Sequence, residues 1–566
     1  MPLSSRMLLS TLQRQALMNT KPKLAQSVRS RVPAYRLLHT TSRRCASDVP
    51  RPVVKGSSYK TTILATLVSL ALGFGLAKAS QSKSEKVDLF GKFGTPKDFE
   101  AAIAELRSIL SIDPTQVSTD PDDLHNHGFS VNAHNNGSAV YSVVVYPHST
   151  EDVVQIVRIA TKYRMPITPY SGATSLEGHF YAHPVGGICV DMSHMDQIIA
   201  IHDADGDLVC QPGAQWMDIN ATLKEKGIPL FFPIDPAPGA TIGGMLSTGC
   251  SGTNAVRYGT AKGEWFLNAT VVLPSGEIIK TRRRSRKSSA GFDTTKLFIG
   301  AEGTLGIVTE VTIRLAPVLP TTVAVAQFPD VQKATEAVSE VLRTGVGIQC
   351  VELVDDVFVA AINKCGSSKR KYPVSDSLWF KLQGPTNQSL EETASIVEEI
   401  VKKHGATGFE LAANAEEADD LWTDRKNAHF YGLGLREGAK GWPTDVCVPV
   451  SKLPQLVYET KKDINASGLL STIVGHVGDG NFHALILFMD DDEKEKAAAK
   501  EIVKRMVKRA IDLDGTCTGE HGVGIGKKAY LTEELGEGTV RLMKRIKREI
   551  DPLGLFNPGK LYPDDD

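Results

Sequence analysis

The chain has 566 residues, of which 42% are hydrophobic and 23% are charged. This composition is ordinary for a folded protein and excludes wholesale disorder, and at about 150 residues per domain the length predicts three or four structural units. The 64 Lys and Arg nearly balance the 65 Asp and Glu, and a formal net charge of −1 excludes nucleic-acid binding driven by bulk positive charge. The eight Cys include no CxxC pair, which argues against a disulfide scaffold, a zinc ribbon or a thioredoxin-like centre.

The first 80 residues have the composition of a targeting segment followed by an anchor. Residues 1–47 contain no Asp or Glu and nine Lys or Arg, which is typical of a mitochondrial transit peptide; a disordered basic tail is the alternative. Residues 61–80 carry no charge before Lys78, and about 17 uncharged residues reach the short limit for a transmembrane anchor, a buried core helix being the alternative. We therefore expect a mitochondrial inner membrane protein with the bulk of the chain in the intermembrane space.

From residue 95 the pattern becomes that of a folded α+β protein. Thr95 as cap and Pro96 in the first turn predict a helix start, which opens a helical lead-in over 95–138. Short strands and short helices alternate over 139–318. Over 319–545, strands are mixed with longer amphipathic helices, so a second α+β unit is expected there.

Three glycine-rich segments lie at 169–178, 235–254 and 300–308. Small residues let backbone N–H groups approach an anion closely, and Ser and Thr hydroxyls add donors. One such segment is most often only a turn, but three within 140 residues favour a large extended ligand that carries a pyrophosphate. No complete GxGxxG is present, and the glycine-lysine stretch at 524–527 departs from a P-loop, so neither usual nucleotide motif has support.

A metal site is predicted from a hairpin at 470–488. An Asp-Gly dipeptide at 479–480 is a strong signal for a two-residue turn, which would place His476 opposite His483 with Cβ atoms about 5 Å apart. Two such imidazoles can bind one divalent ion, and the pair Glu520-His521 supplies a third oxygen or nitrogen donor; two packed or exposed histidines are the alternative. Because this set leaves coordination positions open, it suits catalysis, with zinc or manganese as the metal.

These motifs together resemble the vanillyl-alcohol-oxidase-type FAD enzymes. The resemblance spans about 95–562 and rests on PHSTEDV, PYSGATSLEG, PAPGATIGGM, LFIGAEGTLGIVTE and FNPGK. It implies a two-lobed α+β, PCMH-type FAD-binding domain over 139–318, an α+β cap with an antiparallel sheet over 319–545, and a C-terminal return to the FAD domain over 546–566. It also implies FAD as cofactor; His179 after the first glycine segment raises the alternative of a covalent flavin, and we favour a noncovalent one.

The resemblance assigns a set of cofactor-binding residues. The segment from Pro169 to Ser175 would wrap the pyrophosphate, and Asn557 would close on the cofactor from the tail. The full predicted set is Pro169, Ser171, Gly172, Ala173, Thr174, Ser175, Gly178, Thr241, Gly244, Ser251, Gly252, Ile307 and Asn557.

More narrowly, the chain resembles the 2-hydroxy-acid dehydrogenases of that family. By this resemblance, a divalent metal binds the three residues named above, and His521 is the catalytic base. Arg425, which could otherwise lie on an exposed cationic helix face, would meet the substrate carboxylate, with Lys440 as a weaker candidate.

The expected function is FAD- and metal-dependent oxidation of D-lactate to pyruvate, with electrons passed to cytochrome c. The alternatives are oxidation of D-2-hydroxyglutarate or glycolate on the same residues, or a membrane-tethered flavin- or metal-binding module without turnover.

Overall fold

The computed structural model describes residues 93–564 except 111–112, 131–132, 135–136 and 367. The expected transit peptide at 1–47 and anchor at 61–80 lie outside the described residues. Among the helices that are described, none has the length and apolar character needed to cross a membrane.

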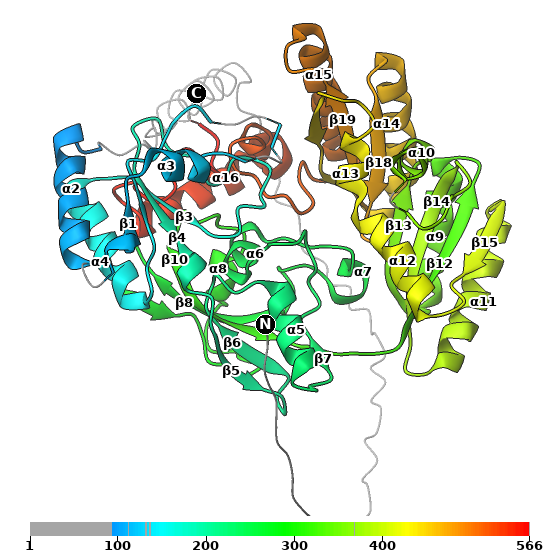
Figure 1. Cartoon of the computed structure of the whole chain (residues 1–566), viewed down its shortest axis with the longest axis horizontal. Helices are drawn as coiled ribbons and strands as arrows, with labels where there is room; N and C mark the ends of the chain where they lie inside the picture. Colours follow the sequence, from blue (N-terminus) through cyan, green and yellow to red (C-terminus); the bar gives the residue numbers. More distant parts are fainter. Residues whose placement is uncertain (1–92, 111–112, 131–132, 135–136, 367, 565–566) are drawn as a thin grey trace, which may run out of the picture. The chain divides into compact units, whose positions relative to one another are not determined.

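The first lobe is a four-stranded sheet with helices packed against it. The order β1-β2-β4-β3 has parallel pairing of β4 with both β2 and β3, while β1 is antiparallel to β2. Helices α2 and α4 lie side by side against the sheet (Figure 1). As predicted, Thr95 caps α2 in a capping box with Asp98. The elements are α2 (Pro96–Ile109), β1 (Val117–Ser118), α3 (Pro121–His127), β2 (Val143–Val145), α4 (Thr150–Tyr163), β3 (Ile167–Tyr170) and β4 (Ile188–Asp191).

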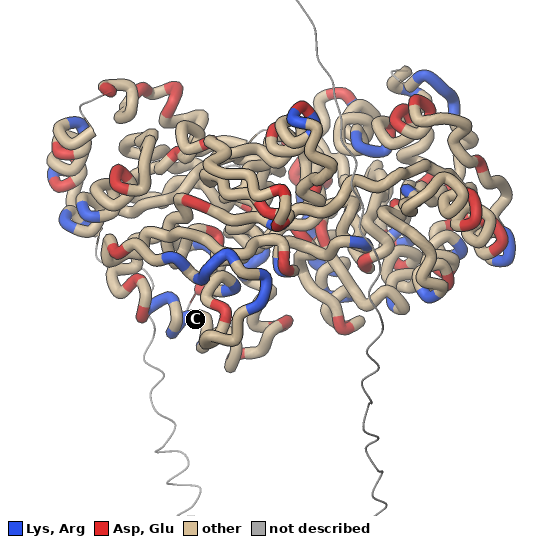
Figure 2. Tube along the Cα trace, turned by 90° about the horizontal axis from the view of Figure 1, so that it is seen from below, with Lys and Arg blue, Asp and Glu red and all other residues tan. Residues whose placement is uncertain are grey.

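The second lobe contains a five-stranded antiparallel sheet in the order β5-β6-β10-β8-β9. Its elements are β5 (Ile198–His202), β6 (Asp207–Cys210), α5 (Trp216–Glu225), β7 (Leu230–Phe231), α6 (Ile242–Thr248), α7 (Ala255–Tyr258), β8 (Phe266–Val272), β9 (Ile278–Lys280), α8 (Thr295–Phe298), β10 (Ile307–Arg314) and β11 (Ala316–Pro317). Basic and acidic residues are interspersed along the described chain (Figure 2). Even in the basic run at 280–287, Arg284 pairs with Asp205 and Asp207.

The cap is an eight-stranded antiparallel sheet covered on both faces. Its order is β15-β12-β14-β13-β18-β19-β16, and β17 pairs with β19. Alternate side chains of β12 point to opposite faces of the sheet. Ala324 and Ala326 pack in the core with α9, α11, α14 and α15. Val323 and Val325 pack in the other core, with α10, α12 and α13. The two lobes and this antiparallel sheet confirm the predicted α+β fold class.

The strands of the cap are β12 (Thr321–Phe328), β13 (Ile348–Val354), β14 (Asp376–Gln383), β15 (Gly408–Leu411), β16 (Lys440–Pro443), β17 (Val446–Cys447), β18 (Ser471–Gly475) and β19 (Asn481–Phe488). Its helices are α9 (Val331–Thr344), α10 (Asp356–Cys365), α11 (Asn387–Lys403), α12 (Ala415–Lys426), α13 (Ala428–Leu433), α14 (Leu453–Ser467) and α15 (Glu493–Asp512).

The predicted register of the β18–β19 hairpin is wrong by two residues. His483 pairs with Val474, not with His476, and the chain reverses over 476–480 instead of within two residues. The backbone N–H groups of Asp479 and Asn481 both donate to the His476 carbonyl, at 3.0 and 3.3 Å, and this closes the longer turn. Because strand side chains alternate with a period of two, the shift keeps both imidazoles on one face, with ring centroids 5.3 Å apart.

The C-terminal segment joins the cap back to the first lobe. After α16 (Leu531–Ile550), Phe556 forms a parallel bridge with Ile167 of β3. The Lys547 ammonium is buried at the start of this return, and burial lowers its pKa. It donates to the Asp551 carboxylate at 2.5 Å and to the carbonyls of Thr304 and Phe556 at 2.7 and 2.9 Å. Through these bonds the Lys547 side chain connects the C-terminal segment to the loop that precedes β10.

Replacing Lys547 with Met is expected to destabilise the protein by about 3–5 kcal/mol, because the Asp551 carboxylate is left buried without its cation. Chemical denaturation followed by circular dichroism measures this loss. The control is Arg541→Met on the same helix, whose exposed pair with Glu537 should contribute little. Equal midpoints for the two variants would contradict the role given to Lys547.

Candidate functional site

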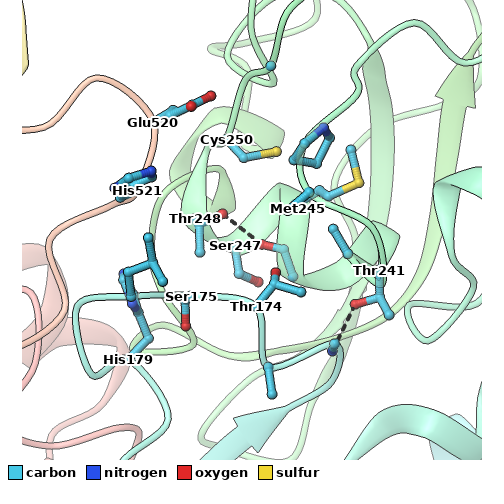
Figure 3. Close-up of a pocket in the computed structure, with 18 of the residues that line it drawn as sticks. Thr174, Ser175, His179, Thr241, Met245, Ser247, Thr248, Cys250, Glu520 and His521 are labelled. Carbon is cyan, nitrogen blue, oxygen red and sulfur yellow. Dashed lines mark hydrogen bonds between the residues drawn. The ribbon is translucent and has the colours of Figure 1, made fainter. Parts of the chain in front are cut away.

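A cavity of about 620 Å³ lies where the two lobes meet the cap. Figure 3 shows Glu520 and His521 across this space from Thr241. The lobes line it with residues from 169–180, 235–253 and 302–308, and the cap lines it with residues from 425–430, 472–485 and 520–521. One wall therefore comes from the glycine-rich segments and the other from the predicted metal and substrate residues.

The glycine-rich wall forms a closely packed cradle. Gly172 has room for no side chain, because a Cβ there would lie 2.4 Å from the Gly239 carbonyl oxygen. The Gly172 N–H donates to Thr241 Oγ1 at 3.3 Å, and that hydroxyl donates to Ser171 Oγ at 2.8 Å. Asn557 Oδ1 is buried in the lining without a partner among the described residues. The cradle thus offers backbone, hydroxyl and amide groups that fit a large polar cofactor such as FAD.

All predicted cofactor residues line this cavity except Gly178 and Ser251. Gly178 has a φ of +76° and packs against the Tyr181 ring, where a Cβ would come within 2.9 Å. Ser251 donates its hydroxyl to Glu520 Oε2 at 2.7 Å. Its side chain therefore contacts a predicted metal ligand.

The three predicted metal ligands converge. His476 Nε2 lies 3.1 Å and His483 Nε2 lies 3.2 Å from Glu520 Oε1, and all three side chains are at most 12% exposed. His483 Nδ1 lies 2.9 Å from the Thr444 carbonyl oxygen, which can only accept, so Nδ1 carries the proton and Nε2 presents a lone pair. Two imidazole nitrogens and a carboxylate oxygen that meet at these distances form a donor set that fits a divalent metal.

The charges around this cluster also favour a cation. Burial alone would lower the pKa of His476, but the Glu352 and Glu520 carboxylates outweigh it and raise the pKa well above its usual value. Burial alone would raise the pKa of Glu520, but His476 and His483 hold it well below the usual range. The carboxylates of Glu352 and Glu520 therefore stabilise a positive charge at the point where the ligand atoms meet.

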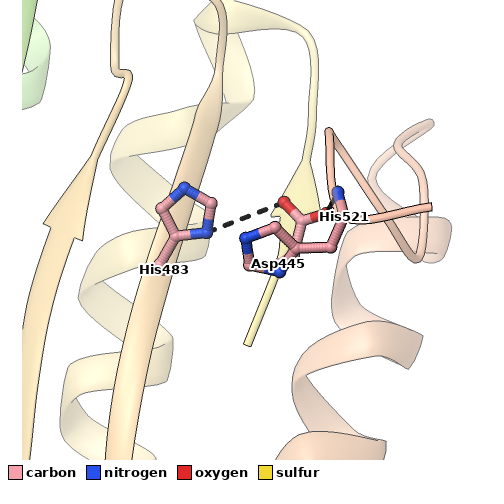
Figure 4. Close-up of side chains that lie close together, drawn as sticks. All are labelled: Asp445, His483 and His521. Atoms are coloured by element: carbon pink, nitrogen blue, oxygen red, sulfur yellow. Dashed lines mark hydrogen bonds and ion pairs between the residues drawn. The ribbon is translucent and has the colours of Figure 1, made fainter. Parts of the chain in front are cut away.

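Asp445 forms a second cluster with His483 and His521 (Figure 4). Its Oδ2 already accepts the backbone N–H groups of Glu520 and His521, each at 2.9 Å, and its Oδ1 accepts the Asn481 amide at 2.7 Å. With its lone pairs used in this way, Asp445 positions the loop instead of binding metal. Burial lowers the pKa of His521 to about 4, so its imidazole is neutral at pH 7 and able to accept a proton.

Arg425 lies on α12 and lines the cavity with a side chain that is 7% exposed. One guanidinium nitrogen donates to Glu352 at 2.5 Å, and Nε is buried with no partner among the described residues. A buried donor without a partner fits the binding of an anion. Lys440, the weaker candidate, is absent from the cavity lining and pairs with Asp490 at 2.7 Å.

The loop that carries His521 docks onto the second lobe. The Glu302 carboxylate accepts the N–H of Val523 at 2.6 Å and of Gly524 at 2.8 Å. Gly524 and Gly526 are needed for this close approach, because a Cβ on either would lie 2.2 Å or less from an oxygen of Glu177. The glycine-lysine stretch at 524–527 is therefore a docking segment.

Three functional carboxylates were missed by the sequence analysis: Glu302, Glu352 and Asp445. Glu352 and Asp445 are fully buried and interrupt apolar runs. A buried carboxylate requires compensating partners, so a charged residue that interrupts an apolar run is the sequence signal that could have indicated Glu352, within β13, and Asp445, between β16 and β17. Glu302 lies within the motif LFIGAEGTLGIVTE, but nothing in that motif indicates which backbone N–H groups its carboxylate accepts.

Comparison with known proteins agrees with this architecture. Two protein-family models match the chain. The family described as FAD binding domain matches residues 141–282, and the family described as FAD linked oxidases, C-terminal domain, matches residues 320–561. The chain is 43% identical to the mitochondrial D-lactate dehydrogenase (cytochrome) of Arabidopsis thaliana over 462 residues, which cover 81% of this chain and 80% of the relative. It is 40% identical over 481 residues to D-lactate dehydrogenase (cytochrome) 1 of Saccharomyces cerevisiae, covering 83% and 81%.

The fold is also similar to that of p-cresol methylhydroxylase, with a TM-score of 0.68 and 18% identity over 84% of this chain and 99% of that one. This likeness confirms the PCMH-type fold. The chain belongs to the family of FAD-linked oxidoreductases that includes the D-lactate dehydrogenases (cytochrome). It is accordingly an FAD-binding oxidoreductase.

Replacing Glu302 with Gln should free the docked loop, since an amide cannot accept two N–H groups with a charged carboxylate's strength. We expect the amide hydrogens of Val523 and Gly524 to exchange with deuterium about 10- to 100-fold faster. Glu310→Gln on β10 is the control, because its carboxylate pairs with Lys280 far from this loop in sequence. Unchanged exchange in the Glu302 variant would contradict the docking role.

Proposed function

We propose that this protein oxidises D-lactate to pyruvate with FAD and one divalent metal, zinc or manganese, and passes the electrons to cytochrome c. The observation that carries the proposal is the convergence of His476, His483 and Glu520 beside the unpaired Nε of Arg425. This group faces the glycine-rich cradle across a single cavity. The names of the two dehydrogenase relatives support D-lactate as the substrate and a cytochrome as the acceptor.

Each residue has a role that follows from its surroundings. Arg425 binds the substrate carboxylate through the guanidinium donors that Glu352 leaves free. The neutral imidazole of His521 takes the hydroxyl proton on a ring nitrogen. His476, His483 and Glu520 hold the metal, and the cradle from Pro169 to Ser175 holds FAD. When bound, the metal supplies positive charge that lowers the hydroxyl pKa, and FAD supplies the acceptor for the hydride that leaves Cα.

The proposed location is the mitochondrion. It is supported by the acid-free, basic composition of residues 1–47 and by the mitochondrial names of the relatives. We further propose that residues 61–80 anchor the protein in the inner membrane with its catalytic part in the intermembrane space. That side of the membrane would give the reduced enzyme access to cytochrome c.

His521→Ala should slow flavin reduction by D-lactate about 10²- to 10⁴-fold while FAD remains bound, because the hydroxyl proton then has no acceptor. Stopped-flow bleaching of the flavin band near ~450 nm measures the rate, since any flavin absorbs there. The control is His404→Ala, which removes a cap histidine that pairs with Glu340. Reduction at the wild-type rate in the His521 variant would refute the assignment of the base.

Metal removal should abolish D-lactate oxidation without releasing FAD, because the metal and the cradle lie on opposite walls. The measurement is cytochrome c reduction with D-lactate, L-lactate, glycolate and D-2-hydroxyglutarate, before chelation, after it, and after adding back zinc or manganese. If the protein oxidises glycolate or D-2-hydroxyglutarate faster than D-lactate, that acid would replace D-lactate as the proposed substrate. Full activity in metal-free protein would refute the metal site, and a yellow protein that oxidises none of these acids would indicate a binding module.

A further inference from the structure

Glu352 lies behind the cavity wall, on β13 between β14 and β18. Its side chain is fully buried and is absent from the cavity lining. It therefore touches neither the cavity nor any group that enters it. Its carboxylate nevertheless contacts two residues that do line the cavity, His476 and Arg425.

The contacts of Glu352 define what it does to each neighbour. His476 Nδ1 lies 2.9 and 3.0 Å from the two carboxylate oxygens, and the Arg425 guanidinium donates to one of them at 2.5 Å. A proton held on Nδ1 directs the Nε2 lone pair of His476 toward Glu520. The same carboxylate holds one end of the guanidinium, so that the unpaired Nε stays in place.

The other two metal ligands are supported differently. His483 donates to the neutral carbonyl of Thr444, and Glu520 accepts from the neutral hydroxyl of Ser251. Among these three ligands, His476 has a carboxylate at hydrogen-bond distance from its outer nitrogen, 2.9 Å from Glu352, whereas the Asp445 carboxylate lies 3.7 Å from His483 Nδ1. A carboxylate there raises the basicity of the ligating nitrogen more than a carbonyl does. That charge is shared with Arg425.

We propose that Glu352 is a positioning residue that couples the metal site to the carboxylate-binding site. This inference rests on the proposed function, because it takes His476 as a metal ligand and Arg425 as the group that binds the substrate carboxylate. If one buried carboxylate orients both, its removal weakens metal binding and substrate binding together. A residue that served only to pack β13 would affect stability and leave both affinities unchanged.

The test is Glu352→Gln in the full-length, FAD-loaded protein. Its shape is nearly that of Glu, but its single carbonyl oxygen cannot serve both donors with a full charge. We expect zinc affinity, measured without substrate by competition with a chromophoric chelator, to fall about 10- to 100-fold. We expect the KM for D-lactate at saturating metal to rise by at least about tenfold, as for loss of a binding interaction.

Two further variants make the result specific. Arg425→Ala should raise the KM for D-lactate without weakening zinc binding, because it leaves the whole charge of the Glu352 carboxylate to His476. Asp355→Asn is the matched control: Asp355 is a buried carboxylate immediately after β13 that caps α10 and lies 3.8 Å from the Lys461 ammonium. Since Asn also caps helices well, this variant should fold and keep both affinities.

The outcomes separate this inference from the proposed function. Wild-type protein that binds neither zinc nor manganese, or that does not oxidise D-lactate, refutes the proposed function; if it binds manganese alone, the same competition is measured with manganese. Wild-type protein that does both, with a Glu352→Gln variant in which zinc affinity and KM do not both change, refutes the coupling alone. If that variant does not fold, Glu352→Asp keeps the charge but shortens its reach, and it should weaken both affinities by a smaller factor. Wild-type values for either affinity in Glu352→Asp would then refute the coupling.

Discussion

The site depends on two imidazole nitrogens and one carboxylate oxygen that meet at 3.1–3.2 Å. Glu520 accepts a proton-mediated contact from His476 there, and a divalent cation that replaces this proton can be bound by all three groups. His476 follows β18 and His483 lies on β19 of the same hairpin, whereas Glu520 comes from the loop at 518–524, 44 residues after His476. Their convergence therefore requires that the cap sheet and this loop be held in a fixed relation.

Buried carboxylates provide that fixed relation. The loop is rich in glycine, which allows close approach to Glu177 but raises the entropy lost on ordering. Asp445, from the cap, accepts the N–H groups on one side of the loop, and Glu302, from the second lobe, accepts those on the other. Charge-assisted bonds of this kind are stronger than neutral ones, so they offset part of that entropy. His521, the proposed catalytic base, is consequently held by both the cap and the second lobe.

The sequence predicted the fold class and the residues of the cavity better than the contacts behind them. Glycine segments and capping residues act locally, so their positions in the chain are informative by themselves. The hairpin register failed because an Asp-Gly pair also fits a longer turn closed on the His476 carbonyl. Glu352 lies 124 residues before His476, and no local pattern indicates which distant donors a buried carboxylate meets. Such pairings are decided by the packing of the sheet.

Ser251 shows how closely the cofactor cradle and the metal cluster are joined. It was predicted to contact the cofactor, and its neighbours Cys250 and Gly252 do line the cavity. Its own hydroxyl instead donates to Glu520 Oε2, while Oε1 of that carboxylate faces the two histidines. The cradle side is therefore linked to Glu520, a proposed metal ligand, by a direct hydrogen bond. The two walls of the cavity thus meet at Ser251, which suits the proposed reaction, in which proton and hydride leave the same substrate in different directions.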